Sequence, residues 1–206
     1  MKIILLGAPG SGKGTQASRI SEKYNLPHIS TGDIFREITR SGTPLGDKIK
    51  KLIDGGNLCP DNLTVEIVKD RLLRPDCANG YILDGFPRDI AQAKEMEKFS
   101  TPDLVINLYI DLDKIEKRIT GRRVCKDCLN SFHVDHVGDT KICPNCKGEL
   151  IVRDDDNPSS VKERLKVYKD CTEPLIDFYQ QHGLLKTVNG DGEIDKVFGE
   201  LVKILG

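Results

Sequence analysis

Short apolar runs alternate along this chain with longer segments in which apolar residues recur every three or four positions. The apolar runs predict five strands, at residues 2–6, 27–30, 81–84, 104–110 and 184–189. The first, fourth and fifth are rich in Ile, Val and Leu, as strands covered on both faces must be. Because strands and helices alternate from end to end, we expect an α/β fold with a five-stranded parallel sheet.

The segments with helical period predict eight helices, and several carry local end signals. They span residues 15–24, 31–40, 45–55, 61–73, 89–99, 113–121, 160–181 and 193–205. Ser160 followed three residues later by Glu163 is typical of a capping box at a helix start. Pro44 can open the helix that follows it, and Gly121 and Gly183 are natural helix stops.

Two segments depart from this simple alternation. Residues 122–158 hold two CxxC pairs and short strand-like pieces without helical period, which predicts an inserted module. Residues 31–59 carry two helices, more than a strand-to-helix connection requires. We therefore expect a core made of residues 1–30, 60–121 and 159–206, with a helical insertion and a metal-bearing insertion.

The segment GAPGSGKGT, residues 7–15, follows an apolar strand and opens a helix. Its glycines let the backbone adopt positive φ, so that successive N–H groups can surround phosphate oxygens. The helix N-terminus adds partial positive charge, and Lys13 supplies a mobile full charge. This context predicts a phosphate loop rather than an ordinary glycine-rich turn. The strict pattern GxxxxGK[ST] is not met, because Gly14 stands in the place of the magnesium-binding hydroxyl and Thr15 follows one residue later.

Asp84 ends the predicted strand at residues 81–84. In phosphate-loop folds, a carboxylate at the end of a strand beside the first strand faces the metal shell. We therefore predict that Asp84 lies on the metal side of the site, with an N-capping or loop aspartate as the alternative.

The chain has seven cysteines, and four of them form two CxxC pairs with fourteen residues between the pairs. Four thiolates fill a tetrahedral zinc shell and leave no position for water, so this spacing predicts a structural zinc site. The expected ligands are Cys125, Cys128, Cys143 and Cys146. His133 and His136 lie between the pairs but are not needed; redox-active or free cysteines are the alternative. A module this small cannot fold on burial alone, whereas structural zinc supplies about 10–16 kcal/mol in model peptides.

Composition narrows the possible partners. Lys plus Arg is 31 and Asp plus Glu is 32, a formal net charge of -1, so no global field favours nucleic acid or an anionic membrane. The early apolar stretch at residues 3–6 is far below the roughly 18 residues of a spanning helix and too short for a signal peptide. We expect a soluble, cytoplasmic monomer without nucleic-acid or membrane partners, in which Cys59, Cys77 and Cys171 are reduced thiols.

Several motifs, taken in order, closely resemble those of the adenylate kinase family. They are GAPGSGKGT at residues 7–15, STGDIFR at 30–36, LDGFPR at 83–88, Gln92, and RITGRR at 118–123. The match spans nearly the whole chain, and with the CxxC module and the later Arg153 and Arg164 it resembles the long, zinc-containing form of the family. The resemblance implies a P-loop three-layer fold and the reaction of ATP with AMP to give two ADP, with Mg2+ bound alongside ATP and Zn2+ as a structural ion.

Six arginines fall at positions that line the phosphate cleft in that family. They are Arg36, Arg88, Arg118, Arg122, Arg153 and Arg164. Guanidinium groups hold phosphate oxygens in bidentate fashion and keep their charge. The resemblance implies that the first two grip the AMP phosphate, that Arg122 contacts ATP, and that the other three surround the transferring group, the last two from the AMP side. Arg123 is expected to be structural, and any one arginine taken alone could be an ordinary surface residue.

The resemblance also implies which residues select the two nucleotides. The AMP positions are Thr31, Asn57, Leu58, Cys59, Gly85, Phe86, Pro87 and Gln92. Gln92 has its own rationale, because an amide offers a donor and an acceptor to an adenine edge; the alternative is an ordinary polar residue on its helix. The ATP positions are Gly10, Ser11, Gly12, Lys13, Gly14, Thr15, Arg122, Ser131, Phe132 and Gly192.

These residues imply in-line phosphoryl transfer without an obligatory protein base, because the AMP phosphate is already anionic. Lys13 and magnesium would neutralise the leaving ADP, while Asp33 and Asp84 orient metal-bound water. The cysteine module would act as a lid that excludes water and carries Arg122 and Arg153 over ATP. Its hinge candidates are Gly121, Asn157 and Pro158.

The sequence leaves three other functions open. A kinase for another nucleoside monophosphate, such as UMP or CMP, could use the same cleft. A phosphate-loop ATPase could dock the CxxC module on DNA or RNA as a zinc ribbon, although residues 125–146 contain only Lys126 and Lys141 as bases. A regulatory metal sensor predicts that zinc removal changes partner binding and leaves thermal unfolding largely untouched.

Overall fold

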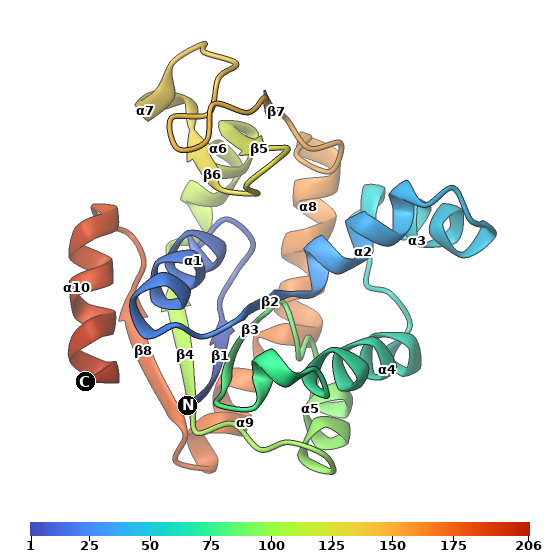
Figure 1. Cartoon of the computed structure of the whole chain (residues 1–206), viewed down its shortest axis with the longest axis vertical. Coiled ribbons are helices and arrows are strands. Elements are labelled where there is room, and N and C mark those ends of the chain that lie inside the picture. Colours follow the sequence, from blue (N-terminus) through green and yellow to red (C-terminus); the bar gives the residue numbers. More distant parts are fainter.

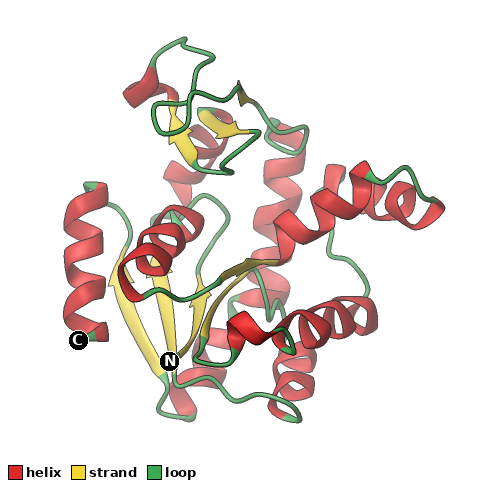
Figure 2. Cartoon of the chain, in the orientation of Figure 1, coloured by secondary structure: helices red, strands yellow, loops and turns green.

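Five parallel strands form the central sheet of the computed structural model, which describes residues 1–206 (Figures 1 and 2). The strands are β1 (Lys2–Leu6), β2 (His28–Ser30), β3 (Tyr81–Asp84), β4 (Leu104–Tyr109) and β8 (Leu185–Asn189), in the order β2-β3-β1-β4-β8. The register pairs Leu5 of β1 with Asp84 of β3 and with Ile106 of β4. The predicted α/β fold is therefore confirmed, and each strand begins and ends within one residue of its predicted range.

Ten α-helices surround and extend this sheet. They are α1 (Lys13–Tyr24), α2 (Thr31–Arg40), α3 (Pro44–Asp54), α4 (Asp61–Leu72), α5 (Ile90–Glu97), α6 (Ile115–Thr120), α7 (Val134–Val137), α8 (Pro158–Val167), α9 (Pro174–Gln181) and α10 (Ile194–Leu205). Short 3-10 turns occur at Pro75–Cys77 and Leu112–Lys114. No helix has the length and apolar character needed to cross a membrane.

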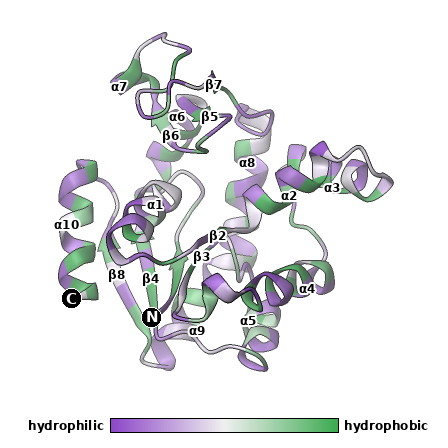
Figure 3. Cartoon of the chain, in the orientation of Figure 1, coloured by the Kyte–Doolittle hydropathy of each residue, from purple (hydrophilic) through white to green (hydrophobic).

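Two hydrophobic cores, one on each face of the sheet, make the fold three-layered. Within β1, the side chains of the even-numbered residues pack with α5 and α9, and those of the odd-numbered residues pack with α1 and α10. Each fully buried aliphatic side chain contributes about 1.5–3 kcal/mol relative to exposure. Figure 3 shows the difference in character between β4, which is largely hydrophobic, and α8, which is largely hydrophilic.

The cysteine-rich segment forms a second, antiparallel sheet in the order β6-β5-β7. Its strands are β5 (Arg122–Cys125), β6 (Ser131–His133) and β7 (Leu150–Ile151). Figure 1 shows this sheet, with α7, at the top of the view, beyond the ends of the parallel strands at which α1 begins, while α2 and α3 project to one side. Both insertions therefore lie next to the end of the sheet that carries the phosphate loop.

The predicted helix at residues 160–181 is wrong in extent. After α8 the chain passes through a π-helical turn at Tyr168–Thr172 before α9 begins. Pro174 lies at the start of α9. Because proline lacks a backbone N–H and crowds the preceding turn, it cannot lie inside a continuous α-helix.

The predicted capping box of Ser160 and Glu163 is also wrong. The N-cap of α8 is Asn157, whose Oδ1 accepts a hydrogen bond from the backbone N–H of Ser160 at 3.0 Å. Pro158 occupies the first helical position, where no N–H is needed, and this moves the helix start upstream.

Three other predicted helix ends are confirmed. Pro44 opens α3, and Gly121 caps the C-terminus of α6. Gly183 follows the cap of α9 and adopts a positive φ of 70°, which suits glycine at a helix end. Two further starts differ from prediction by more than one residue: α1 begins at Lys13, and the segment predicted as one helix from residue 113 begins with a 3-10 turn.

Candidate active site

The phosphate loop connects the end of β1 to the start of α1. Gly7, Gly10 and Gly12 have positive φ values of 139°, 78° and 96°. At Gly7 a Cβ would lie 2.5 Å from the backbone oxygen of Leu108, so only glycine fits. The expected positive φ is therefore confirmed at these three glycines, whereas the same expectation for Gly14 is wrong, because Gly14 already lies within α1.

Lys13 folds back over its own loop, because Nζ donates to the backbone oxygens of Gly7 and Ala8 at 2.8 and 2.9 Å. Burial lowers the pKa of the Lys13 ammonium to about 7, although the negative charge of Asp84 opposes this shift. The guanidinium of Arg88 lowers the pKa further. An anion entering the loop would reverse this balance and stabilise the charged ammonium.

Asp84 ends β3 between its two neighbouring strands, opposite Leu5 of β1 and Ser30 of β2. Its Oδ2 lies 3.5 Å from the position of a Cβ on Gly14, which places the carboxylate against the first turn of α1. Burial alone would raise the pKa of Asp84, but His28 and the charge of Lys13 lower it to about 2. The carboxylate is therefore ionised at neutral pH.

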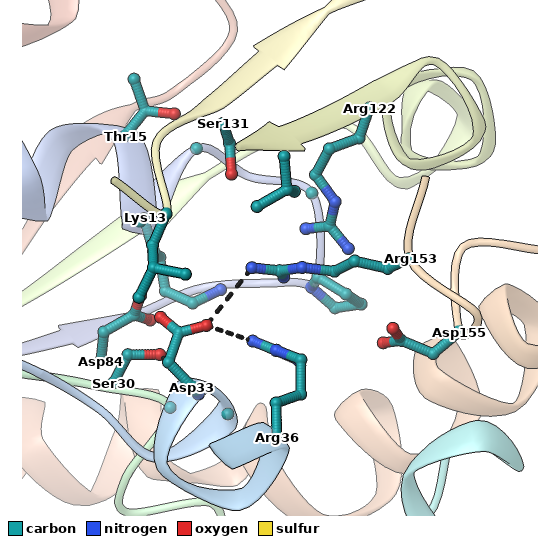
Figure 4. Close-up of a pocket in the computed structure, with 18 of the residues that line it drawn as sticks. Lys13, Thr15, Ser30, Asp33, Arg36, Asp84, Arg122, Ser131, Arg153 and Asp155 are labelled. Carbon is teal, nitrogen blue, oxygen red and sulfur yellow. Dashed lines mark hydrogen bonds and ion pairs between the residues drawn. The ribbon is translucent and has the colours of Figure 1, made fainter. Parts of the chain in front are cut away.

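A cleft of about 1420 Å³ opens between the phosphate loop and the two insertions, and all six arginines predicted for the phosphate cleft line it. Figure 4 shows Lys13, Arg36, Arg122 and Arg153 directed toward one shared space. Positive side chains from separate parts of the sequence are thus concentrated in one cleft. Carboxylates form ion pairs with four of the six arginines.

Asp33 of α2 forms ion pairs with two of these arginines. Its Oδ1 accepts from Arg36 at 2.7 Å and from Arg153 at 3.4 Å, as Figure 4 shows. Although burial would raise the pKa of Asp33, the Arg36 guanidinium holds it below its usual range. Burial and the neighbouring guanidinium of Arg36 lower the pKa of Arg153 to about 10. Through its ion pair with Arg153, Asp33 links the helical insertion to the cysteine module.

Two adjacent aspartates neutralise the next pair of arginines. Asp156, whose side chain is 0% exposed, accepts from Nε of Arg122 at 2.8 Å and also pairs with its terminal nitrogen. Arg164 reaches the same carboxylate at 3.4 Å and Asp155 at 2.9 Å. Neither aspartate is among the predicted site residues, although both follow Arg153 closely in the run RDDDN, which indicates a local charge network.

Arg88 and Arg118 pair with no carboxylate. Arg88 donates from Nε to the backbone oxygen of Gly85 at 2.7 Å, and burial lowers its pKa. Arg118 donates to the backbone oxygen of Gly190 at 3.2 Å, and its guanidinium lies against Gly12 of the phosphate loop. Of the six arginines predicted for the phosphate cleft, these two can thus meet an incoming anion without first releasing a carboxylate.

Most of the residues predicted to select AMP lie along one side of the cleft. Thr31, Asn57, Leu58, Cys59, Gly85 and Gln92 line it. Phe86 is 0% exposed within the hydrophobic core, and neither it nor Pro87 lines the cleft. These two predicted AMP positions therefore lie outside the cleft lining.

Gln92 is already held by hydrogen bonds within the protein. Its Oε1 accepts from the backbone N–H of Arg88 at 2.9 Å, and its Nε2 donates to Asp61 at 2.7 Å. Each group keeps one hydrogen-bonding position unused, because an amide offers two donors and two acceptor sites. Asp61 is a third residue that the sequence did not predict for the site, and it fixes the amide in one orientation.

The residues predicted for ATP lie on the opposite side, around the phosphate loop. Gly10, Ser11, Gly12, Lys13, Gly14, Thr15, Ser131, Phe132 and Gly192 all line the cleft. The Ser11 hydroxyl is buried without a partner. A buried donor left free in a phosphate loop suits a ligand oxygen, because burying it without a partner is costly.

The four predicted zinc ligands form one cluster, with all four Sγ atoms within 4.8 Å of one another. Cys125 and Cys146 are 3.4 Å apart at Sγ, and Cys128 and Cys143 are 3.7 Å apart. A tetrahedral zinc site with Zn–S bonds of about 2.3 Å requires sulfur atoms about 3.8 Å apart. The cysteine cluster therefore suits a zinc ion without further ligands.

His133 lies outside this cluster, as predicted for the histidines between the CxxC pairs. Its Nδ1 accepts from the backbone N–H of Asp135 at 3.2 Å, which caps α7. Arg123 likewise has a structural contact, a hydrogen bond to the backbone oxygen of Arg122 at 2.9 Å.

Comparison with known proteins agrees with this site. A family model described as "Adenylate kinase" matches residues 5–184. The chain is 50% identical to "Adenylate kinase" of Acetivibrio thermocellus over 212 residues, 48% to that of Alkaliphilus oremlandii over 213 and 49% to that of Lachnospira eligens over 214. The alignments cover 100% of this chain and 98%, 99% and 100% of those relatives. The chain therefore belongs to the adenylate kinase family and is a nucleoside monophosphate kinase, a phosphotransferase enzyme.

Proposed function

We propose that this chain transfers the γ-phosphoryl group of Mg-ATP to AMP, reversibly, to give two ADP. The observation that carries the proposal is the convergence of Lys13 and six arginines on one cleft beside the phosphate loop. Two nucleotides meeting end to end bring many negative charges together, and their reaction needs charge neutralisation and positioning more than covalent chemistry. A cleft rich in fixed guanidinium groups supplies both.

ATP would occupy the phosphate-loop side of the cleft. The backbone N–H groups of residues 10–15 and the ammonium of Lys13 would hold its phosphates, with Arg122 over them. Ser131, Phe132 and Gly192 would border its base. Arg118 stands beside Gly12 and Gly190, which favours a role on this donor side.

AMP would occupy the side formed by the helical insertion. Its phosphate would meet Arg88, which has no carboxylate partner, and Arg36, which would turn from Asp33 to the ligand. Arg153 and Arg164 would exchange their carboxylate partners for the transferring group in the same way. Phosphate oxygens and carboxylates compete for the same guanidinium groups. The phosphates of a substrate can therefore replace the carboxylate partners of these arginines.

The base of AMP would lie between Thr31, residues 57–59 and Gln92. The unused donor and acceptor positions of the Gln92 amide can meet an adenine edge, while Asp61 and the Arg88 backbone keep the amide from rotating. UMP and CMP present a different hydrogen-bonding edge, so base choice rests on this fixed amide.

Magnesium fits beside the phosphate loop, because Asp84 and Asp33 are half-buried carboxylates with lowered pKa values and Mg2+ prefers oxygen ligands. These two side chains would hold the ion through its water molecules. When bound with ATP, magnesium neutralises charge on the β- and γ-phosphates. Gly14 leaves no hydroxyl at its position, and Thr15 follows one residue later.

We further propose that residues 122–158 close as a zinc-stapled lid and that residues 31–59 close over AMP, both against a core of residues 1–30, 60–121 and 159–206. Gly121, Asn157 and Pro158 would serve as hinges of the lid. The two insertions already meet through Arg153 with Asp33 and through Lys50 with Asp154 at 3.2 Å. Closure excludes water, which would otherwise accept the phosphoryl group. Action as a cytoplasmic monomer is part of this proposal.

A direct assay tests the proposal. Purified protein is mixed with Mg-ATP and, in separate reactions, AMP, UMP or CMP, and ADP formation is followed for the native chain and for Lys13→Ala. We expect rapid ADP formation with AMP, much less with UMP or CMP, and a large loss in the variant. A preference for UMP or CMP would show that AMP is not the phosphoryl acceptor. Undiminished turnover by the variant would show that Lys13 has no role in the mechanism.

A further inference from the structure

His28 is a half-buried polar side chain, 19% exposed, that takes no part in the transfer described so far. Its Nε2 atom is buried and has no hydrogen-bond partner of ordinary geometry. The carboxylate oxygen Oδ2 of Asp84 lies 3.5 Å away. A buried ring nitrogen without a partner is costly, so the position of this one beside an anion requires a reason.

The strand register brings the two side chains together. In the parallel pair of β2 and β3, His28 lies opposite Ile82 and Ser30 lies opposite Asp84. Paired residues of neighbouring strands point to the same face, so His28 and Asp84 are diagonal neighbours on one face. Ile82 packs in the core beneath α1, which identifies this face as the one that α1 covers.

The charge of Asp84 determines which ring nitrogen carries the proton. Asp84 is ionised, so a lone pair on Nε2 would face a carboxylate oxygen and repel it, whereas an N–H there would attract it. The other ring nitrogen is not buried in this way and can turn its lone pair to water. The surroundings therefore favour the tautomer of His28 with hydrogen on Nε2.

The start of α1 contacts the same carboxylate oxygen. Oδ2 of Asp84, which faces His28, also lies 3.5 Å from the position of a Cβ on Gly14, and the charge of Lys13 acts on the carboxylate. A carboxylate at the end of a strand can rotate about its side-chain bonds unless a second group holds it. His28 is the neighbouring donor on the β2 side, so the imidazole and the start of α1 together restrict where this oxygen can lie.

We propose that His28 is a positioning residue for phosphoryl transfer: its Nε2–H holds the Asp84 carboxylate in the orientation that faces the phosphate loop and the magnesium bound there. This inference rests on the proposed function, because it assigns Asp84 to the magnesium side of the site. The contact shortens from 3.5 Å when the cleft is filled, as hydrogen bonds in empty active sites commonly do.

The first test compares two substitutions. His28→Leu removes the donor, and His28→Gln keeps an N–H that can reach the same carboxylate. For the Leu variant we expect kcat to fall about 10-fold, as for loss of a hydrogen bond to a charged group, with KM for AMP unchanged. The affinity gain that Mg2+ gives to a non-hydrolysable ATP analogue, measured by calorimetry, should fall by a similar factor. The Gln variant should recover most of both quantities.

His182→Leu is the matched control, because His182 is an exposed histidine at the end of α9 whose Nδ1 lies 2.6 Å from the Phe178 backbone oxygen. It should leave kcat and the magnesium response unchanged. Equal kcat and equal magnesium response in His28→Leu and the native chain would overturn the inference. A Gln variant as impaired as the Leu variant would do the same, because it would show that ring packing and not the donor matters.

A spectroscopic measurement decides the point even if the Leu variant does not fold. The imidazole ¹⁵N resonances of His28 in the native chain should report hydrogen on Nε2, and Asp84→Asn should shift that resonance. Hydrogen on Nδ1, or no shift with Asp84→Asn, would overturn the inference. Absence of phosphoryl transfer from ATP to AMP in the native chain would instead refute the proposed function, and the imidazole spectrum distinguishes the two failures.

Discussion

Replacing Asp156 by Asn tests whether carboxylates hold the cleft arginines in the empty enzyme. The Asp156 side chain is 0% exposed, and those of Arg122 and Arg164 are 16% and 20% exposed. The substitution keeps the shape of the side chain but removes its charge, so two largely buried guanidinium groups lose a counter-ion. Removing one partner of a buried ion pair costs about 3–5 kcal/mol. Because Arg164 keeps Asp155, we expect the lower end, about 3 kcal/mol.

Thermal unfolding measures this cost. In a chain of this length, 1 kcal/mol corresponds to about 2–4 °C in Tm, so Asp156→Asn should lower Tm by about 6–12 °C. The loss should be recovered in part by a saturating nucleotide polyphosphate, whose oxygens supply the missing negative charge. The ligand should therefore raise the Tm of the variant more than that of the native chain.

Asp154→Asn provides the control, because Asp154 is 80% exposed and pairs only with Lys50 across the surface. Exposed ion pairs contribute about 0–1 kcal/mol, so its Tm should change by no more than about 4 °C. If Asp156→Asn unfolds together with this control, or gains no more from the ligand than the native chain does, the charge exchange described for the cleft is refuted.

Three further predictions concern Arg88, Lys13 and the cysteine cluster. Arg88→Met should lower kcat about 10³-fold, with exposed Arg74→Met as the unchanged control, and a fall below tenfold would contradict the role of Arg88. Because the pKa of Lys13 is about 7 in the empty loop and an anion raises it, calorimetry in different buffers should show proton uptake approaching one per ATP at pH 8 and little at pH 6. That uptake should vanish in Lys13→Arg. Zinc removal by a chelator should lower Tm and activity together, whereas an unchanged Tm would favour the metal-sensor alternative.

The strands, the phosphate loop and the cysteine cluster follow from short-range patterns. A strand covered on both faces must be apolar along its length, and a phosphate loop must place glycine where φ is positive, so each leaves a local mark in the sequence. The spacing of two CxxC pairs likewise indicates, from the sequence alone, the four ligands of one zinc ion. The adenylate kinase family is shown by the comparisons, whereas the individual roles of the cleft residues remain predictions.

Contacts between distant segments are what the sequence does not predict. Asp33 bonds to Arg153, 120 positions away, and Gln92 is fixed by Asp61. The spacing of apolar residues along the sequence does not predict such pairs, because they depend on how the insertions lie against the core. The sequence predicts His28 only as part of a strand, because its contact with Asp84 depends on strand order and register.

The most direct test is the structure of the protein bound to a bisubstrate analogue in which a chain of five phosphates joins two adenosines. If one shared cleft binds both nucleotides, the phosphates will lie within hydrogen-bonding distance of Lys13, Arg88, Arg122 and Arg164, with Asp156 released from at least one arginine. Phosphates bound elsewhere, with these side chains still paired as in the empty cleft, would contradict the proposed function.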